Sequence, residues 1–358
     1  MKKICFVFNS LGIGGSQKIE AFVANACKRS VYDVSVICFT KSDVGVEIDP
    51  DIPIQYVLNE RTKSIVSNIK KVLFLWKLRK EIQKENPDII CVFLADITRI
   101  VVLACKGLNI PIIGSERGAP GRHGKRLKRY NKAFTRCRKV VFQTEEARAY
   151  YNLPEHLVEI ISNPCFPRWE NNKVLSQTPK IICGAGRLCR QKRFDVLINA
   201  FFYVHKKHPE YRLRIYGSGP LENELKEQIN NLGLIDSAQL CGYSKDVFSE
   251  VGIPEVFVLS SDYEGIPNVL MEAMSLGTAC VATNCEPGGA KMLFANETRG
   301  LLSPLGDDLK LATNINRIIE DEVLANHLRE KSKEINEEYA PSVIEAKWLQ
   351  VFDKCIKR

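Results

Sequence analysis

The sequence predicts an α/β protein of two domains, each built on a parallel β-sheet with helices packed against it. Three observations support this prediction. Short apolar runs typical of buried strands alternate with helical segments along the chain. Glycine-rich turns follow several of these runs, and the same alternation starts again near residue 180. The length of 358 residues also exceeds what one hydrophobic core usually serves.

The first half begins with a predicted strand over residues 4–8, a glycine turn over 12–15 and a helix over 17–29. The turn lacks the full Gly-x-Gly-x-x-Gly spacing, so it is weak evidence for a dinucleotide cofactor. Its place after the first strand nevertheless puts it where open α/β sheets bind ligands. The predicted helix has one apolar face, made of Ile19, Phe22, Val23 and Ala26. Further strands are predicted over 34–39, 89–94, 110–114 and from 140, before a helix capped by Thr144.

Positive charge is concentrated in the first half. The chain carries a net charge of +9; residues 1–165 hold 27 Lys and Arg against 16 Asp and Glu, and residues 166–358 hold 24 against 26. A basic amphipathic helix is predicted over 63–84, and such a helix either lies on an anionic membrane or packs on the sheet with its lysines in solvent. Its predicted apolar face consists of Ile65, Ile69, Val72, Leu73, Trp76 and Leu78.

Nine cations lie between Arg122 and Lys139. No helix-turn-helix, zinc-ligand spacing or RNP-type aromatic run accompanies them, so nucleic acid is not expected as a partner. A membrane or phosphate role is favoured, because each cation near an anionic bilayer contributes about 1 kcal/mol. Asp49 and Asp51 spell an Asp-x-Asp metal motif, but their position between βα units predicts a surface turn.

The composition favours a cytoplasmic protein. The longest apolar runs fall far short of the roughly 20 residues that a membrane span needs. Thirteen cysteines is an odd number, no pair forms Cys-x-x-Cys, and several lie inside apolar runs. We therefore expect small buried thiols in a reducing compartment.

The second half follows a polar segment over 168–179, which is the predicted linker. Its predicted strands cover 180–185, 211–216, 257–259 and 278–283. Its predicted helices cover 196–204 and 343–356, and another begins at Asp246.

One stretch, residues 257–274, reads as a strand, a Glu-Gly-x-Pro turn and a helix with Pro267 just inside its start. A helix that begins there presents free N–H groups to a phosphate, and Gly265 permits close approach. Glu264 and Glu272 suit the hydroxyl groups of a sugar and a ribose. Alternatively, Glu272 is a first-turn glutamate that satisfies the helix dipole and Glu264 is a solvated loop charge. Arg187 and Lys192, between a strand and a helix, can neutralise a diphosphate or simply be surface charges.

These residues also carry a family resemblance. The run Ser-x-Tyr-Glu-Gly-Ile-Pro-Asn-Val-Leu-Met-Glu-Ala-Met-Ser-Leu-Gly from Ser261 resembles the Glu-x7-Glu signature of the retaining glycosyltransferases of family 4. Gly-Arg-Leu-x-x-Gln-Lys-x-Phe-Asp from Gly186 resembles the donor-phosphate loop of that family. The Gly-x-Gly-Pro turn at 217–220 resembles its turn near the nucleotide, and 240–243 its loop beside the nucleobase.

The resemblance implies a GT-B fold, with two facing Rossmann-like domains and a C-terminal helix that crosses back to the first. Residues 1–167 with about 342–358 would form the acceptor side, and 168–341 the donor domain. The enzyme would move a sugar, with retained configuration, from a nucleotide-sugar to a saccharide or a polyprenyl-diphosphate-linked acceptor, using no metal or cofactor. We expect the nucleotide to be UDP. A bacterial surface polysaccharide at an anionic membrane is the expected setting.

The resemblance also assigns roles to residues. Arg187 and Lys192 would bind the diphosphate, Glu264 the donor sugar and Glu272 the ribose. The leaving phosphate would itself take the acceptor proton. The other implied donor contacts are Gly14, Gly15, Gly217, Gly219, Tyr243, Gly265, Ile266, Pro267, Asn268 and Val269. Glu116 and Arg117 are weaker acceptor-side candidates.

The first domain departs from the family pattern at two places. Many relatives have a histidine in the loop that corresponds to Ser115–Gly118, whereas here the next histidine is His123. Many also have a glutamate at the position of Gln17. Two other functions stay open: a nonhydrolysing UDP-sugar 2-epimerase of the same architecture, and a noncatalytic nucleotide-sugar-binding subunit.

Overall fold

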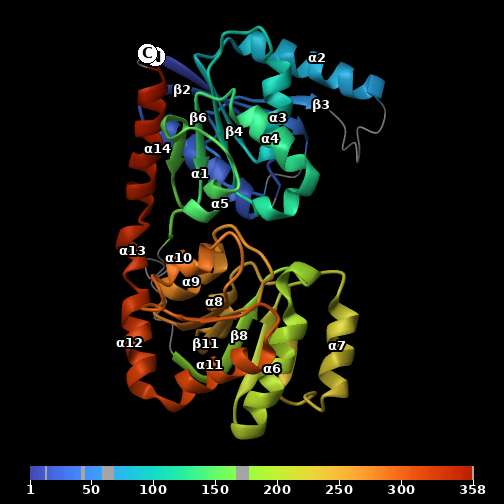
Figure 1. Cartoon of the computed structure of the whole chain (residues 1–358), viewed down its shortest axis with the longest axis vertical. Helices are drawn as coiled ribbons and strands as arrows, with labels where there is room; N and C mark the ends of the chain where they lie inside the picture. The colour runs from blue at the N-terminus through green and yellow to red at the C-terminus, as the bar shows by residue number, and fades with distance from the viewer. Residues whose placement is uncertain (13, 42–44, 59–67, 167–176, 357–358) are drawn as a thin grey trace. The chain divides into compact units, whose positions relative to one another are not determined.

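The computed structural model describes residues 1–12, 14–41, 45–58, 68–166 and 177–356. The chain divides into two compact units. Unit 1 contains residues 1–164 and 342–358, and unit 2 contains residues 165–341. Each unit is built on one parallel sheet (Figure 1).

Unit 1 has a seven-stranded sheet with the order β3-β2-β1-β4-β5-β6-β7. Neighbouring strands are parallel throughout, as the alternation of strands and helices predicted. The short strands β3 and β7, at the two edges, were not among the predicted ones. The strands are β1 (Lys2–Phe8), β2 (Tyr32–Thr40), β3 (Ile54–Leu58), β4 (Ile89–Phe93), β5 (Ile112–Ser115), β6 (Lys139–Phe142) and β7 (Val158–Ile160).

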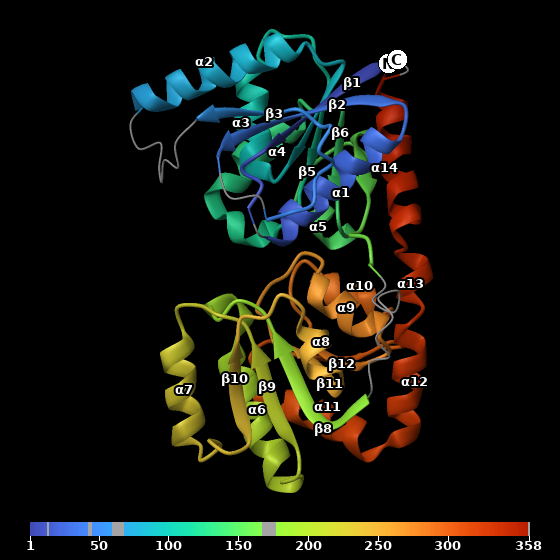
Figure 2. The ribbon, with the colours of Figure 1, turned by 180° about the vertical axis from the view of Figure 1, so that it is seen from behind.

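The pleat of the sheet divides the core of unit 1 into two halves. On β1, Cys5 and Val7 pack towards α2, α3 and α4. Phe6 lies on the other face, where its ring contacts Phe352 of α14 at 5.9 Å. Figures 1 and 2 show these layers. The helices are α1 (Gly15–Arg29), α2 (Asn68–Glu85), α3 (Ala95–Ala104), η1 (Pro120–Arg126), α4 (Leu127–Phe134), α5 (Glu145–Ala149), η2 (Glu155–Leu157) and α14 (Pro341–Ile356).

The predicted apolar face of α2 is largely wrong, and that of α1 is largely confirmed. On α2 the buried apolar side chains are Phe74, Leu78 and Ile82, of which Leu78 was predicted, whereas Val72, Leu73 and Trp76 are exposed. The reason is position: α2 packs near the edge of the sheet, on the edge strand β3, its neighbour β2 and α3, so only one row of its side chains is covered. On α1 the predicted face is confirmed for Ile19, Val23 and Ala26, which are buried, whereas Phe22 is only partly buried. Glu20 is also buried, which was not predicted. Residues 63–67 of the predicted helix and Ile13 of the glycine turn lie outside the described residues.

Unit 2 has a six-stranded parallel sheet with the order β10-β9-β8-β11-β12-β13. Gln177 and Thr178 already pair with β11, so the predicted linker at 168–179 is wrong at its C-terminal end; residues 168–176 of it lie outside the described residues. The strands are β8 (Gln177–Ala185), β9 (Arg212–Tyr216), β10 (Ala238–Gly242), β11 (Ile253–Leu259), β12 (Ala279–Thr283) and β13 (Leu301–Ser303).

The helices of unit 2 cover both faces of its sheet. Alternate residues of β8 and β11, such as Ile182 and Val258, share a core with α6, α7, α11 and α12. On the opposite face, Phe257 contacts Phe248 of α8 at 5.8 Å. The helices are η4 (Arg190–Lys192), α6 (Phe194–Lys207), α7 (Glu222–Asn231), α8 (Val247–Val251), α9 (Asn268–Ser275), α10 (Gly289–Leu293), α11 (Asp308–Glu320), α12 (Glu322–Ser332) and α13 (Ile335–Glu338).

The cysteines behave as buried apolar side chains. All thirteen are free, and only Cys189 and Cys241 are more than marginally accessible. Burial raises the pKa of Cys183 and Cys280 above the usual range of a thiol. Among the helices that the structure describes, none is long and apolar enough to cross a bilayer.

Candidate active site

The site of unit 2 lies where its strand order reverses. β8 is flanked by β9 on one side and β11 on the other, and the loops after these strands leave in different directions. In open α/β sheets the crevice at such a point, outside the carboxyl ends of the strands, holds the ligand. The predicted donor residues after β8, β9 and β11 are thereby gathered at one edge of the sheet.

The loop after β8 carries the two predicted phosphate-binding cations. Arg187 is exposed and makes no side-chain hydrogen bond with the described part of the chain. Lys192 lies at the end of η4, where its aliphatic chain covers Gly186; a Cβ at Gly186 would lie 2.9 Å from the Lys192 Cε. The loop therefore offers one free guanidinium and one lysine held in place by packing.

Lys192 binds directly to Glu264, which follows β11. The Lys192 ammonium lies 2.6 Å from the Glu264 Oε1, and the Ser261 hydroxyl donates to the same oxygen at 2.8 Å. The side chains of Lys192 and Glu264 are only 16% and 11% exposed. The sequence suggested both residues separately, but their contact follows from the pairing of β8 with β11.

Backbone hydrogen bonds hold Glu264 at this position. Its N–H donates to the carbonyl of Glu286 at 3.0 Å, which ties the loop after β11 to the loop after β12. On the other side, the Gln191 side chain donates to the Tyr263 carbonyl at 2.9 Å, and the Asp262 N–H donates to the Gln191 carbonyl at 2.8 Å. Glu264 is thus an organised part of the site, which argues against its being a solvated loop charge.

Glycines allow the neighbouring loops to touch through their backbones. A Cβ on Gly217 would lie 1.8 Å from the Gly186 carbonyl oxygen, and Gly217 has a φ of +146° that favours glycine. A Cβ on Gly219 would lie 2.3 Å from the Leu188 carbonyl oxygen. Gly289, which was not predicted as a site residue, would place a Cβ 1.8 Å from the Gly265 carbonyl oxygen. Its signal was the glycine turn after β12.

The helix after β11 begins one residue later than predicted. Pro267 is the N-cap of α9, not its first residue, since its ψ of 102° is extended. No side chain caps the N-terminus of α9, and the first turn contains no acidic residue. Glu272 is therefore not a first-turn glutamate, which contradicts that interpretation of it. Ile266 and Pro267 are buried, so only their backbone can meet a ligand.

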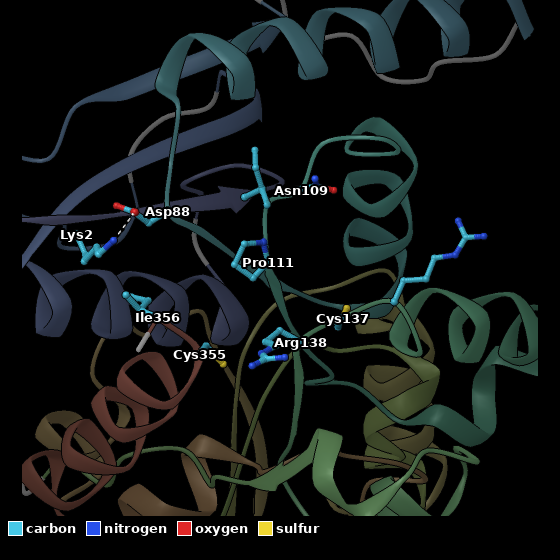
Figure 3. Close-up of a pocket in the computed structure, with 10 residues that line it drawn as sticks. Lys2, Asp88, Asn109, Pro111, Cys137, Arg138, Cys355 and Ile356 are labelled. Carbon is cyan, nitrogen blue, oxygen red and sulfur yellow. Dashed lines mark hydrogen bonds and ion pairs between the residues drawn. The ribbon is translucent and has the colours of Figure 1, made fainter. Parts of the chain in front are cut away.

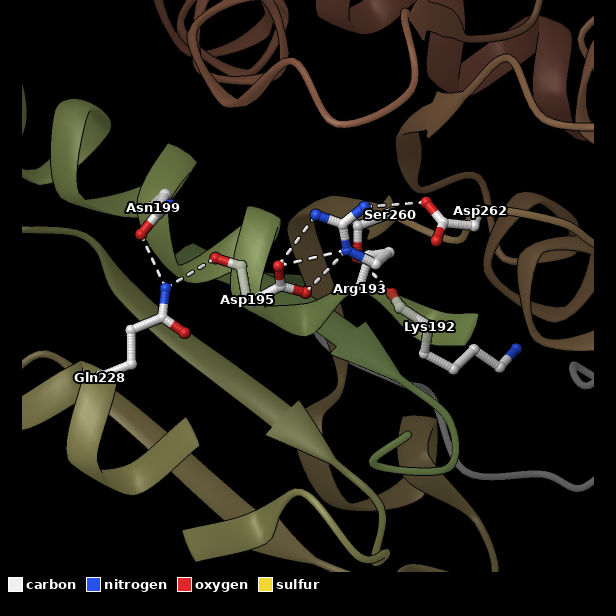
Figure 4. A network of polar contacts seen from close by, with 7 residues as sticks. All are labelled: Lys192, Arg193, Asp195, Asn199, Gln228, Ser260 and Asp262. Carbon is white, nitrogen blue, oxygen red and sulfur yellow. Dashed lines mark hydrogen bonds and ion pairs between the residues drawn. The ribbon is translucent and has the colours of Figure 1, made fainter. Parts of the chain in front are cut away.

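Arg193 is a second residue that the sequence did not single out. It adopts the left-handed conformation (φ 47°, ψ 45°) at the start of α6. Its guanidinium contacts Asp195 at 3.0 Å and Asp262 at 3.0 Å (Figure 4). The hydrogen bonds with Asp195 raise the pKa of Arg193 above its usual value. Arg193 thus joins the loops after β8 and β11, while the Lys192 side chain extends away from this cluster.

The remaining donor candidates of unit 2 are placed less closely. Tyr243 is exposed after β10, and the Gly217 N–H donates to the Gly242 carbonyl at 2.7 Å. Glu272 lies on α9, partly buried. Cys285 is close to Glu264; burial, and then the Glu264 charge, raise its pKa to about 12, so it is a poor nucleophile at neutral pH.

In unit 1, Glu116 lies after β5 and is enclosed. Its side chain is 1% exposed, and its oxygens accept hydrogen bonds from the Arg117 and Gly118 N–H groups, His123 Nε2 and the Tyr151 hydroxyl. We infer that Glu116 positions this loop. His123 contacts this loop through its Nε2, which lies 3.0 Å from the Glu116 Oε2. The sequence spacing did not predict this contact.

Arg117 is also buried in unit 1. Its guanidinium donates to the Ile161 carbonyl at 3.0 Å and lies over the rings of Phe93 and Trp348. Burial lowers its pKa to about 10. Neither Glu116 nor Arg117 displays its charge to solvent, so their acceptor-side role stays a prediction. Gly14 and Gly15 stand at the start of α1, whose N-terminus has no side-chain cap.

Two cavities help to delimit the site. A cavity of about 530 Å³ in unit 2 is lined by Arg190, Arg193 and Asp262, beside the Lys192 loop. A cavity of about 560 Å³ in unit 1 is lined by Lys2, Asp88 and Arg138, which precede or begin strands (Figure 3). This second cavity lies at the amino ends of the strands, away from the edge where α/β sheets bind ligands.

Two open parallel sheets, with a lysine and an arginine suited to phosphate at the switch point of the second, have the architecture of the GT-B class of enzymes. Comparison with known proteins agrees. Residues 166–335 match the model of glycosyl transferases group 1, and residues 13–165 that of glycosyltransferase family 4. An uncharacterized glycosyltransferase of Haemophilus influenzae is 30% identical over 97% of this chain and 99% of its own length. The chain belongs to the family 4 glycosyltransferases.

Other relatives extend the comparison. The GalNAc-alpha-(1->4)-GalNAc-alpha-(1->3)-diNAcBac-PP-undecaprenol alpha-1,4-N-acetyl-D-galactosaminyltransferase of Campylobacter jejuni is 26% identical over 98% of both chains. The crystal structure of Anabaena Alr3699/HepE in complex with UDP superimposes with a TM-score of 0.80 at 17% identity, covering 99% of this chain and 100% of that one. This likeness confirms the predicted GT-B fold.

Proposed function

We infer that this enzyme transfers a sugar, with retention, from a UDP-sugar to a hydroxyl group of a diphosphate-lipid-linked saccharide. The observation that carries the proposal is the largely buried Lys192–Glu264 pair at the switch point of unit 2. It provides a cation for a diphosphate and a carboxylate for a sugar within one contact. The UDP bound to Anabaena HepE and the lipid-linked acceptor named for the Campylobacter enzyme suggest the substrate classes.

The donor's diphosphate would enter between Arg187 and the Lys192 ammonium. Each negative charge that develops on the leaving UDP would then meet a cation already in place, and such preorganised electrostatic stabilisation is usually the largest catalytic contribution. The N-terminus of α9, which begins at Asn268, would add the positive end of its helix dipole to the same group. Because side chains and backbone supply this charge, the proposal needs no metal ion.

Once the diphosphate binds the Lys192 ammonium, the Glu264 carboxylate would leave its contact with Lys192 and accept hydrogen bonds from the donor sugar. Glu272, further along α9, would accept hydrogen bonds from the ribose. The loop contacts through Gly217, Gly219 and Gly289 would keep these groups in register. The acceptor oxygen would attack the face from which UDP departs, and the departing phosphate oxygen would take the acceptor proton.

The proposed setting is the cytoplasmic side of a membrane, where a lipid-linked acceptor is presented. The uneven charge of the chain supports it, since the basic cations gather in the first half. The acceptor side would be unit 1, with Gly14 and Gly15 near the donor phosphate and the loop organised by Glu116 near the acceptor.

A donor panel tests the proposal. UDP- and GDP-sugars would be scored in EDTA by thermal shift and by nucleotide release, with and without a diphospho-undecaprenol-linked saccharide. The variants are Lys192→Ala and Glu272→Ala, and Glu222→Ala is the control because its pair with Lys226 is exposed and lies on α7.

The expected result is one donor that stabilises the wild type and the control but neither site variant, with nucleotide release that needs the acceptor. Turnover without acceptor would instead identify an epimerase. No response to any donor would identify a noncatalytic subunit, and loss of activity in EDTA would refute the metal-free mechanism.

A further inference from the structure

The outer surface of α2, α3 and α4 in unit 1, which we call the α2–α4 face, carries exposed apolar side chains. Val72, Leu73 and Trp76 are 68%, 50% and 54% exposed, on adjacent turns of α2. Single exposed apolar residues need no explanation, but a group that includes a tryptophan marks a surface that meets an apolar partner. The same helix already buries Phe74 and Leu78 against the sheet, so α2 has a second apolar row that the fold does not use.

Lysines surround this row. Lys71, Lys77 and Lys80 are exposed, and the Lys80 ammonium lies 5.6 Å from the centre of the Trp76 ring. None of the three forms an ion pair within the ranges that the structure describes. Apolar side chains flanked by free lysines are the pattern of a helix that lies in the interface of a bilayer.

The same face also carries exposed positive charge around α4. α3 packs against both α2 and α4, and Figures 1 and 2 show the three helices on the same side of the sheet. More cations are exposed around α4, again without an ion-pair partner among the described residues: Lys125, Arg126, Lys128, Arg129, Lys132 and Arg136.

The positive charge of the α2–α4 face distinguishes between its possible binding partners. A second copy of the chain bound to this face would bring lysines of like charge together. A nucleic acid backbone would offer Val72 and Leu73 no apolar surface to contact. An anionic bilayer satisfies both features, since lipid phosphates meet the cations and the acyl boundary takes Trp76. We propose that the α2–α4 face docks this enzyme on an anionic lipid bilayer, with Val72, Leu73 and Trp76 inserted and the lysines at the phosphate level.

This inference deepens the proposed function, since it names the surface that meets the membrane carrying the acceptor. Its test contains neither donor nor acceptor. A failure to bind vesicles would therefore leave a positive donor panel standing, and a failed donor panel would not affect vesicle binding.

The experiment is flotation of the full chain with vesicles of two compositions: phosphatidylcholine alone, and phosphatidylcholine with about 30 mol% of the anionic lipid phosphatidylglycerol. One variant combines Val72→Ser, Leu73→Ser and Trp76→Ser, and another combines Lys71→Gln, Lys77→Gln and Lys80→Gln. The matched control changes three equally exposed apolar residues of unit 2 to serine: Ile235 (69%), Leu309 (57%) and Val323 (82%). Circular dichroism melting verifies that each variant is folded.

We expect the wild type and the control to float with the anionic vesicles only. The lysine variant should partition roughly 100-fold less, because each cation near the surface contributes about fivefold. The apolar variant should partition at least about tenfold less, because burial of one such side chain is enough for that factor. Brominated acyl chains should quench the fluorescence of Trp76, and Trp76→Phe should abolish that component. Equal flotation of the wild type and the apolar variant, or self-association through this face without vesicles, would overturn the proposal.

Discussion

Replacing Glu264 by glutamine should strengthen the binding of UDP while it weakens sugar transfer. The Glu264 carboxylate contacts, at 2.6 Å, the Lys192 ammonium that we assign to the diphosphate. UDP must therefore displace or share this carboxylate before it binds. Glutamine keeps the shape of the side chain and the Ser261 contact but removes the competing charge.

The size of the effect follows from the burial of the pair. An exposed ion pair contributes only about 0–1 kcal/mol, but these side chains are 16% and 11% exposed, so solvent screens them weakly. A charged hydrogen bond contributes about 1.5–3 kcal/mol. We use the lower value, because a lysine has three donors and can be shared; it corresponds to about tenfold in affinity.

Isothermal titration calorimetry with UDP measures this change directly. Glu264→Gln should bind UDP about tenfold more tightly than the wild type and transfer sugar more slowly. Glu222→Gln, which removes the same charge from an exposed Lys–Glu pair on α7, should leave both unchanged. UDP affinity that stays the same or falls in Glu264→Gln would refute the idea that the diphosphate competes with Glu264.

Three further predictions follow from other contacts. Gly289→Ala should cost about 1–3 kcal/mol and abolish the donor-induced thermal shift, since its Cβ would lie 1.8 Å from the Gly265 carbonyl; Gly233→Ala, with nothing within 4 Å, should keep that shift. Burial raises the pKa of Glu20 to about 8 from 4.5, so its contribution to stability is complete below pH 4.5 and is lost as the pH rises through about 8. Glu20→Gln should therefore gain a few kcal/mol over the wild type in urea unfolding at alkaline pH and little at pH 5. Trp348→Ala should lower the unfolding free energy by about 3–5 kcal/mol, yet calorimetry should still show donor stabilisation of the transition of unit 2.

The central strands could be predicted because parallel strands buried on both faces read as unbroken apolar runs. β1, β4 and β11 are of this kind. β3 and β7 are edge strands whose residues are mostly half-buried, so they carry no such run and were missed. The helix α2 was predicted with the wrong face because it has two apolar rows, and periodicity alone cannot tell which one meets the sheet.

The candidate site shows the same division. Residue type and spacing identified Lys192 and Glu264 as separate groups. Lys192 and Glu264 are 72 residues apart in the sequence. They meet because β8 and β11 are neighbours in the sheet, and no local sequence pattern predicts that pairing. Gly289 and Arg193 were overlooked for a similar reason: the importance of each lies in another loop, at Gly265 and Asp262, that only the fold brings near.

The two ends of the chain share one core. Trp348 and Phe352 of α14 are fully buried in unit 1, where Trp348 contacts Phe93 at 5.4 Å and Phe352 contacts Phe6 at 5.9 Å. The ribosome synthesises these residues after all of unit 2. Unit 2 can therefore fold before the last helix of unit 1, α14, has been synthesised. A premature stop codon only a few residues beyond Pro341 would thus leave unit 2 continuous and deprive unit 1 of two of its largest core side chains.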